Sequence, residues 1–117
     1  MRIAFMADIH ANRRALEACL AQAREFGATR LVFLGDYVGY GPDPQGVLEL
    51  IMAETDRGAI AVAGNHDQAV GGLRDAMSLD AEIALAWTRG QVGPGPTADR
   101  VLGKWPRKVA SERSTFP

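Results

Sequence analysis

Cysteine is scarce in this chain of 117 residues, which has Cys19 alone. A single cysteine excludes an intramolecular disulfide and fits a reducing compartment. Long apolar runs are also missing, since no stretch approaches the roughly 20 apolar residues of a membrane span. The apolar run after Arg2 stops at Asp8 and is too short for a secretory signal peptide. We therefore expect a cytoplasmic protein that does not contact membranes.

An excess of one charge sign is missing as well, because the formal net charge at pH 7 is −1. Residues 1–89 carry eight basic and twelve acidic side chains, whereas residues 90–117 carry five basic and two acidic ones. Basic residues this sparse, with two aromatics among them, are more typical of a solvated tail than of a nucleic-acid-binding segment. We expect one domain within residues 1–89 and a Gly/Pro-rich basic tail over 90–117.

Three short apolar runs predict three strands, at residues 2–7, 30–34 and about 59–63. Strands that are apolar on both faces are typical of a parallel sheet covered on both sides. Helical spacing of apolar residues separates the runs, so the order is β-α-β-α-β. Short crossovers of this kind predict a parallel sheet with right-handed connections.

The ends of the two intervening helices carry clear local signals. Asn12 is a candidate N-cap for the first helix, and Gly27 is placed to end it. Asp43 and Pro44 have the residue types of an N-cap and a first helical residue. Cys19 falls on the apolar stripe of the first helix, so we expect a buried structural thiol. In the second helix, the predicted stripe is Val47, Leu48 and Ile51.

The pattern weakens after residue 67. Gly71-Gly72 predicts a break. Leu79, Ile83 and Trp87 are spaced at i, i+4 and i+8, which predicts a third helix over about 79–89 with Ser78 as its cap. The glycine- and proline-rich residues 90–96 are predicted to lack regular structure, and the residues after them to be loosely ordered.

Polar residues that suit metal binding or proton transfer follow each predicted strand: Asp8 and His10, then Asp36, then Asn65, His66 and Asp67. Asp8 and Asp36 are 28 positions apart, and Asp36 and Asn65 are 29 apart. Ligand sites in parallel sheets lie outside the carboxyl ends of the strands. We therefore expect the three clusters to meet at one edge of the sheet.

The residue types indicate a divalent metal site. A carboxylate beside an imidazole, as in Asp8 and His10, suits Mn, Fe, Co, Ni or Zn better than Ca or Mg. Asp36 is placed to bridge two ions, and the neutral carbonyl oxygen of Asn65 suits the second. His66 is then free to act on a substrate. Asp67 is a candidate to hydrogen-bond its ring and set its tautomer or raise its pKa.

Each cluster also has a simpler interpretation. An Asp-x-His pair occurs often by chance, and Gly-Asp after a strand is most often only a turn. Asn65 and Asp67 are also typical of the first turn of a helix. The functional interpretation is favoured because the clusters follow three successive strands and include both histidines of the chain.

Three motifs carry a family resemblance: Asp8-Ile9-His10-Ala11-Asn12, the loop from Gly35-Asp36 to Asp43-Pro44, and Gly64-Asn65-His66-Asp67. They resemble the motifs of calcineurin-like metallophosphoesterases, in particular small bacterial and archaeal phosphodiesterases and diadenosine-tetraphosphatase-like proteins. The resemblance covers about residues 1–89. It implies an α/β fold, namely the β-α-β-α-β half of a four-layer α/β sandwich with a mostly parallel sheet and the second sheet missing.

The resemblance also implies hydrolysis of a phosphodiester, phosphomonoester or nucleotide by a hydroxide that two divalent ions activate. It implies that Asp8 and His10 bind the first ion, that Asp36 bridges, and that Asn65 binds the second. It implies that His66 contacts the phosphate or protonates the leaving oxygen. It implies that Asp67 orients the His66 ring.

The chain departs from the family pattern after His66, because no histidine follows it. Three later histidine ligands of the family are therefore absent, and we expect weak or single metal occupancy and an uncovered sheet face. Three explanations stay open: a reading frame broken soon after Arg89, a short form that dimerises through the uncovered face, or half of a split enzyme.

We expect a truncated and impaired metallophosphoesterase. The alternative is a non-catalytic remnant or binding module that retains a partial metal or phosphate site. A nucleic-acid-binding role for the basic tail is a third, less favoured class. Tyr37 and Tyr40 are candidates for substrate contacts, for example by stacking on a base. Packing of Tyr40 on the rim of the sheet explains its presence equally well.

Overall fold

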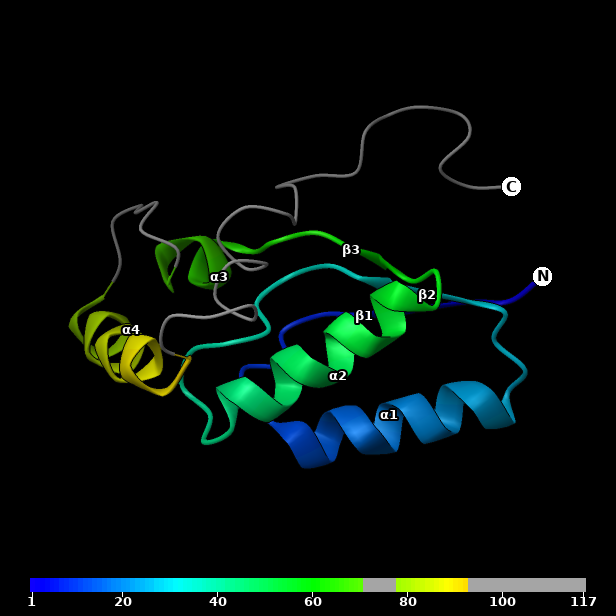
Figure 1. Cartoon of the computed structure of the whole chain (residues 1–117), viewed down its shortest axis with the longest axis horizontal. Coiled ribbons are helices and arrows are strands. Elements are labelled where there is room, and N and C mark those ends of the chain that lie inside the picture. The colour runs from blue at the N-terminus through cyan, green and yellow to red at the C-terminus, as the bar shows by residue number, and fades with distance from the viewer. Residues whose placement is uncertain (71–77, 93–117) are drawn as a thin grey trace.

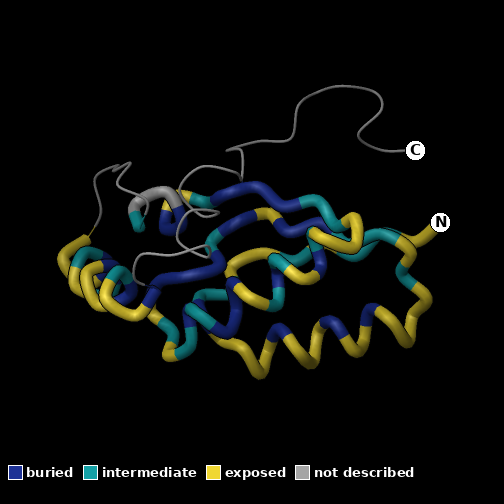
Figure 2. The backbone as a smooth tube through the Cα atoms, viewed as in Figure 1, coloured by how far each residue is buried: buried dark blue, intermediate teal, exposed yellow. Residues whose placement is uncertain are grey.

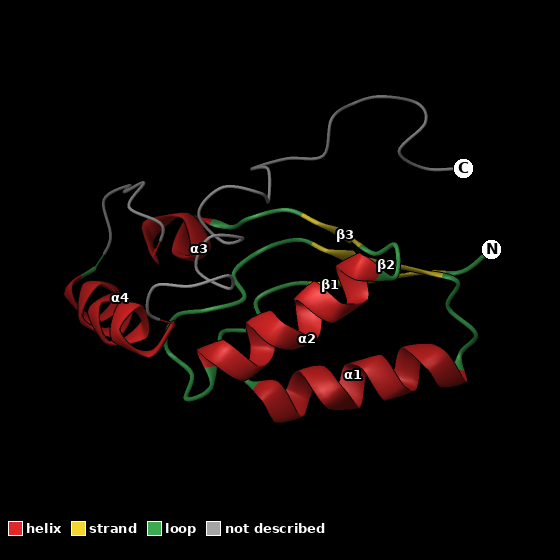
Figure 3. Cartoon of the chain, viewed as in Figure 1, coloured by secondary structure: helices red, strands yellow, loops and turns green. Residues whose placement is uncertain are grey.

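The computed structural model describes residues 1–70 and 78–92. Within them, three parallel strands form one sheet in the order β1-β2-β3 (Figures 1 and 3). The strands are β1 (Ile3–Met6), β2 (Arg30–Phe33) and β3 (Ile60–Ala61). The predicted parallel β-α-β-α-β order is confirmed, with strands shorter than expected. The predicted break at 71–72 and the predicted loose order of residues 93–117 lie outside the described residues.

Local capping chemistry fixes the ends of the two crossover helices. Helix α1 (Arg13–Glu25) begins where the Asn12 side chain accepts a hydrogen bond from the Ala15 N–H at 3.1 Å, and Gly27 follows its end with φ +74°. Helix α2 (Pro44–Asp56) begins where Asp43 accepts from the Gly46 N–H at 2.9 Å. Both predicted helix starts are confirmed.

The core lies between the sheet and these two helices, which sit on the same side of it (Figure 1). Figure 2 shows buried positions on the inner side of α1 and exposed positions on its outer side. The inner positions of α1 are Leu16, Leu20 and Ala23. Cys19 is exposed, so the prediction of a buried thiol is wrong. The packed stripe follows the line through Leu16 and Leu20, and Cys19 lies to one side of it.

The opposite face of the sheet carries exposed apolar side chains. Side chains alternate between the two faces of a strand, and Met6 packs against the core cluster. Phe5 therefore points to the other face, where it is 58% exposed. Leu34, directly after the buried Phe33, is 48% exposed. These two side chains agree with the expectation that one sheet face is uncovered.

Helices α3 (Asn65–Val70) and α4 (Leu79–Val92) lie beyond the carboxyl ends of the strands (Figure 1). Ser78 caps α4, since its hydroxyl accepts from the Ala81 N–H at 3.2 Å, as predicted. The helix continues through Gly90 to Val92, so the prediction that residues 90–92 lack regular structure is wrong. No described helix is long and apolar enough to span a membrane.

The apolar residues whose spacing predicts α4 do not form its buried face. Leu79, Ile83 and Trp87 are 74%, 61% and 46% exposed. The buried stripe consists of smaller or differently placed side chains: Ala81, Leu85, Thr88 and Val92. This stripe faces α2 and α3, which both contact α4.

Candidate metal centre

Two loops run side by side at the carboxyl edge of the sheet, one after β1 and one after β2 (Figure 3). Backbone hydrogen bonds tie them together. The Asp8 N–H donates to the Gly35 carbonyl at 3.2 Å, and the His10 N–H donates to the Asp36 carbonyl at 2.9 Å. This pairing continues the parallel strands beyond the sheet and brings the first two polar clusters to one place.

Asp8, His10 and Asp36 form the candidate metal site. Each has a ligand atom, and these atoms all lie within 4.8 Å of one another. His10 Nε2 is 3.8 Å from Asp8 Oδ1. His10 Nδ1 is 3.1 Å from the Val38 carbonyl oxygen, so Nδ1 carries the proton and donates it there. Nε2 keeps its lone pair, and two carboxylates with a free imidazole nitrogen fit one divalent transition metal.

Backbone strain marks the same two loops. Positive φ angles occur at Asp8 (+54°), His10 (+46°), Ala11 (+58°), Asp36 (+56°) and Tyr40 (+66°). A left-handed conformation costs a residue with a side chain about 1–2 kcal/mol. Such strain collects at functional sites, where the surrounding structure holds it. All three candidate ligands are strained in this way, which supports a functional interpretation of the cluster.

The third cluster joins the site through Asp36, whose Oδ1 accepts a hydrogen bond from the His66 N–H at 3.1 Å. The backbone after β2 comes so close to the backbone after β3 that both loops need a glycine at the contact. A Cβ on Gly35 would lie 2.6 Å from the Gly64 nitrogen, and a Cβ on Gly64 would collide with Asp36. Asn65, the first residue of α3, is exposed.

His66 is buried beside the candidate ligands. Its ring centroid lies 5.0 Å from that of His10 and 5.2 Å from that of Tyr40. Its Nδ1 has no hydrogen-bond partner in the described part of the chain. Burial lowers the pKa of His66, while the charge of Asp36 acts in the opposite direction. The net direction is a fall, and Asp67 is not among its causes.

Asp67 is fully buried, and its carboxylate accepts four backbone N–H groups. Oδ2 accepts from Asp36 and Gly64, each at 2.8 Å, and Oδ1 accepts from Tyr37 at 2.9 Å and Val38 at 3.2 Å. The expected hydrogen bond to the His66 ring is not formed, because backbone donors occupy both oxygens. Burial raises the pKa of Asp67 to about 6, although the backbone hydrogen bonds lower it.

The two tyrosines of the second loop have different environments. Tyr37 is fully buried in the core cluster, and its hydroxyl donates to the carbonyls of Phe33 and Val62. Burial, with the nearby Asp67 charge, raises its pKa. The prediction that Tyr37 contacts substrate is therefore wrong. Tyr40 is 58% exposed and its ring lies 5.4 Å from that of His10, at the rim of the candidate site.

Sequence reasoning missed two backbone contributions to the site. The Val38 carbonyl orients His10. Gly39, with φ +92°, brings the main chain so close to His66 that a Cβ would lie 2.5 Å from Nδ1. The glycine in the loop after Asp36 was the available signal for the second, whereas a carbonyl contact has no sequence signal.

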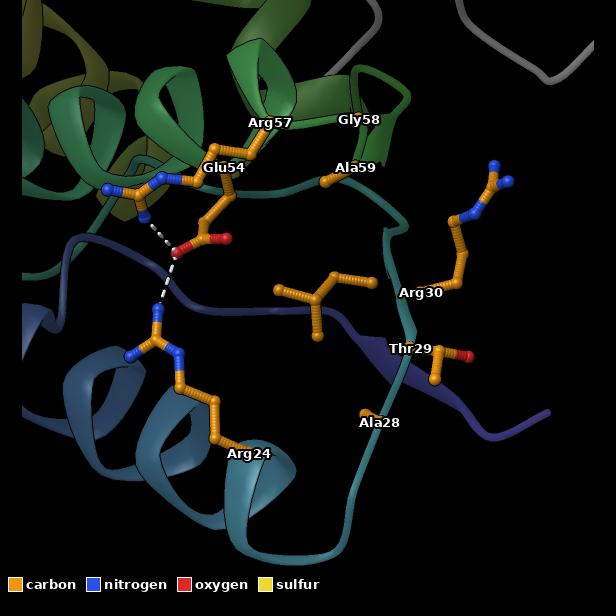
Figure 4. Close-up of a pocket in the computed structure, with 9 residues that line it drawn as sticks. Arg24, Ala28, Thr29, Arg30, Glu54, Arg57, Gly58 and Ala59 are labelled. Atoms are coloured by element: carbon orange, nitrogen blue, oxygen red, sulfur yellow. Dashed lines mark hydrogen bonds and ion pairs between the residues drawn. The ribbon is translucent and has the colours of Figure 1, made fainter.

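A cavity of about 350 Å³ lies at the opposite edge of the sheet, where α1 and α2 end (Figure 4). Among its polar lining residues is Glu54, whose buried carboxylate accepts from Arg24 at 2.7 Å and Arg57 at 3.2 Å. No candidate site residue lines it. The Glu54 group joins the two crossover helices and lies apart from the metal centre.

A model of the calcineurin-like phosphoesterase family matches residues 1–110. The chain belongs to the calcineurin-like phosphoesterases. Phosphodiesterase YfcE of Escherichia coli strain K12 is 35% identical to this calcineurin-like phosphoesterase over 94 residues, which are 74% of this chain and 49% of YfcE. Calcineurin-like phosphoesterases are hydrolases that use divalent metals.

Solved structures of related proteins share the fold. A metallophosphoesterase from Sphaerobacter thermophilus has a TM-score of 0.72 and 35% identity, covering 95% of this chain and 44% of that one. A proposed diadenosine tetraphosphatase has a TM-score of 0.63 and 34% identity, covering 90% and 43%. The chain spans 35–49% of the length of the curated relatives it matches.

Proposed function

We propose that this chain carries the metal-binding part of a phosphoesterase that hydrolyses a phosphodiester or another phosphate ester of a nucleotide. The observation that carries the proposal is the convergence of Asp8, His10 and Asp36, with their ligand atoms within 4.8 Å of one another. The names of the relatives, a phosphodiesterase and a proposed diadenosine tetraphosphatase, support the substrate class.

Asp8, His10 and Asp36 would hold one divalent ion, and Asp36 with Asn65 would hold a second. Manganese, iron, cobalt, nickel and zinc all suit this donor set. A bound cation offsets charge on phosphoryl oxygens and lowers the pKa of water. His66, whose ring lies beside that of His10, would donate a proton to the leaving oxygen, and Tyr40 would contact a base at the rim.

We further propose that the chain by itself binds metal weakly and is impaired in turnover. The sequence has no histidine after His66, and three side chains form the carboxylate–imidazole cluster within the described residues. The same observation favours a second candidate function, a non-catalytic module that retains a partial metal or phosphate site. The single cysteine supports a cytoplasmic location, and the exposed Phe5 supports a homodimer through the uncovered sheet face.

Hydrolysis of an aryl phosphodiester in the presence of Mn²⁺ tests the function. We expect turnover by the wild-type chain and a loss of about 100-fold in Asp36→Asn, which removes a ligand carboxylate. Asp80→Asn is the matched control, because Asp80 is exposed in the first turn of α4. Equal rates in wild type and Asp36→Asn would refute catalysis at this site and leave the non-catalytic module.

A further inference from the structure

The Asp67 carboxylate is the point at which the loops after β2 and β3 are joined. Its four N–H donors come from two separate segments, residues 36–38 and Gly64. Each oxygen accepts two of these bonds, at distances of 2.8–3.2 Å. A side chain that is fully buried and saturated in this way fixes the backbone positions of its donors.

Two of those donors lead directly to candidate metal ligands. The first is the N–H of Asp36 itself, whose backbone has the strained φ of +56°. The second is the N–H of Val38, whose carbonyl accepts the His10 Nδ1 proton at 3.1 Å. The same carboxylate therefore holds the backbone of one ligand and the group that orients another.

We infer that Asp67 is a positioning residue whose carboxylate holds the loop after β2 in the geometry that presents Asp36 and His10 Nε2 to a metal. The inference rests on the proposed metal-binding function and adds to it. It replaces the role expected from the sequence, in which Asp67 orients His66. The Asp67 oxygens accept backbone N–H groups that lead to Asp36 and His10, so Asp67 acts through these two ligands.

Calorimetric titration of the full chain with Mn²⁺ tests the inference. In Asp67→Asn one carboxylate oxygen becomes an NH₂ group, so two backbone N–H donors lose their acceptor whichever way the amide is turned. We expect Mn²⁺ binding about 10–100-fold weaker than in the wild type. Each Mn²⁺ association constant is divided by the fraction of folded protein, which circular dichroism measures. Partial unfolding of the variant then does not imitate a loss of metal affinity.

Glu54→Gln is the matched control. Glu54 is also a buried carboxylate that joins two elements, but it lies at the opposite edge of the sheet (Figure 4). We expect this variant to lose stability while keeping wild-type Mn²⁺ affinity after the same correction. Equal weakening of Mn²⁺ binding in both variants would overturn the inference, because general destabilisation would then explain it.

A second measurement uses metal-free protein and is independent of Mn²⁺ affinity. In the wild type, nitrogen NMR should find the His10 proton on Nδ1, with slow amide exchange at Asp36, Tyr37, Val38 and Gly64. In Asp67→Asn, the His10 proton should no longer be fixed on Nδ1, and amide exchange at Asp36, Tyr37, Val38 and Gly64 should become faster. The N–H groups inside α1 should exchange as slowly as in the wild type. Fast exchange of the four amides in the wild type would overturn the inference even if the variant does not fold.

Failure of the positioning role of Asp67 and failure of the proposed metal-binding function give different results. If the wild type binds Mn²⁺ and Asp67→Asn binds it equally well, the positioning role is refuted and the proposed function remains. If the wild type binds no Mn²⁺, the proposed function is refuted. The positioning of Asp36 and His10 is then decided by the metal-free NMR measurement.

Discussion

At the scale of single residues, the close approach of Gly39 to the His66 ring gives a direct test of the site. A Cβ at residue 39 would lie 2.5 Å from His66 Nδ1, and Gly39 has φ +92°. Gly39→Ala should therefore displace the His66 ring and strain the backbone. We expect turnover of an aryl phosphodiester to fall about 100-fold, since small misplacements near the chemistry have effects of that size.

Gly58→Ala is the control for backbone strain. Gly58 has φ +106°, but nothing lies within 4 Å of the position of its Cβ. Both substitutions should cost about 1–2 kcal/mol of stability by the same left-handed strain. If Gly58→Ala lowers turnover as much as Gly39→Ala, the contact with His66 is not the cause.

The residues that meet at the candidate site could be predicted because they follow successive parallel strands. That rule brings Asp8, His10 and Asp36 to one edge, and the structure has them there. The roles of Tyr37 and Asp67 could not be predicted in the same way. Tyr37 follows Asp36 directly, and only the packed structure shows that its side chain enters the core. Three of the four partners of Asp67 are backbone groups about 30 positions earlier in the chain, which leave no sequence signal.

At the scale of elements, α4 provides a test of which helix face packs. Leu85 is fully buried in α4, whereas Leu79 is 74% exposed. Leu85→Ala should lower the free energy of unfolding by about 2–5 kcal/mol, because it removes buried methyl groups and leaves a cavity. Leu79→Ala should change it by less than about 0.5 kcal/mol. Urea denaturation measures both, and a larger loss in Leu79→Ala than in Leu85→Ala would contradict the buried face that the structure shows.

Helix existence was predictable and helix orientation was not. Capping residues such as Asn12, Asp43 and Ser78 act within three residues of themselves, so their signals survive in the sequence. Several stripes of one helix share helical spacing, and in α4 the exposed stripe includes the large apolar residues Leu79, Ile83 and Trp87. The choice of stripe depends on α2 and α3, which the local sequence does not encode.

At the scale of the whole molecule, exposed apolar side chains among the described residues lie on more than one surface. One is the sheet face with Phe5, and another is the α4 stripe with Ile83. The predicted homodimer uses the sheet face, so Phe5→Lys should shift a concentration-dependent dimer toward monomer. Ile83→Lys should leave the dimer unchanged. Size-exclusion chromatography with light scattering measures both, and a wild type that stays monomeric or a dimer lost only in Ile83→Lys would contradict the prediction.

The 31-residue separation between Asp36 and Asp67 has a consequence during synthesis. Ribosomes add about 5–20 residues per second, so Asp67 is added roughly 2 to 6 seconds after Asp36. For that interval the nascent chain contains Asp8, His10 and Asp36 without the carboxylate that holds their loop. A metal ion that meets the chain in this window meets a flexible chelator, and the strained arrangement can be completed only after the loop that follows β3 has left the ribosome.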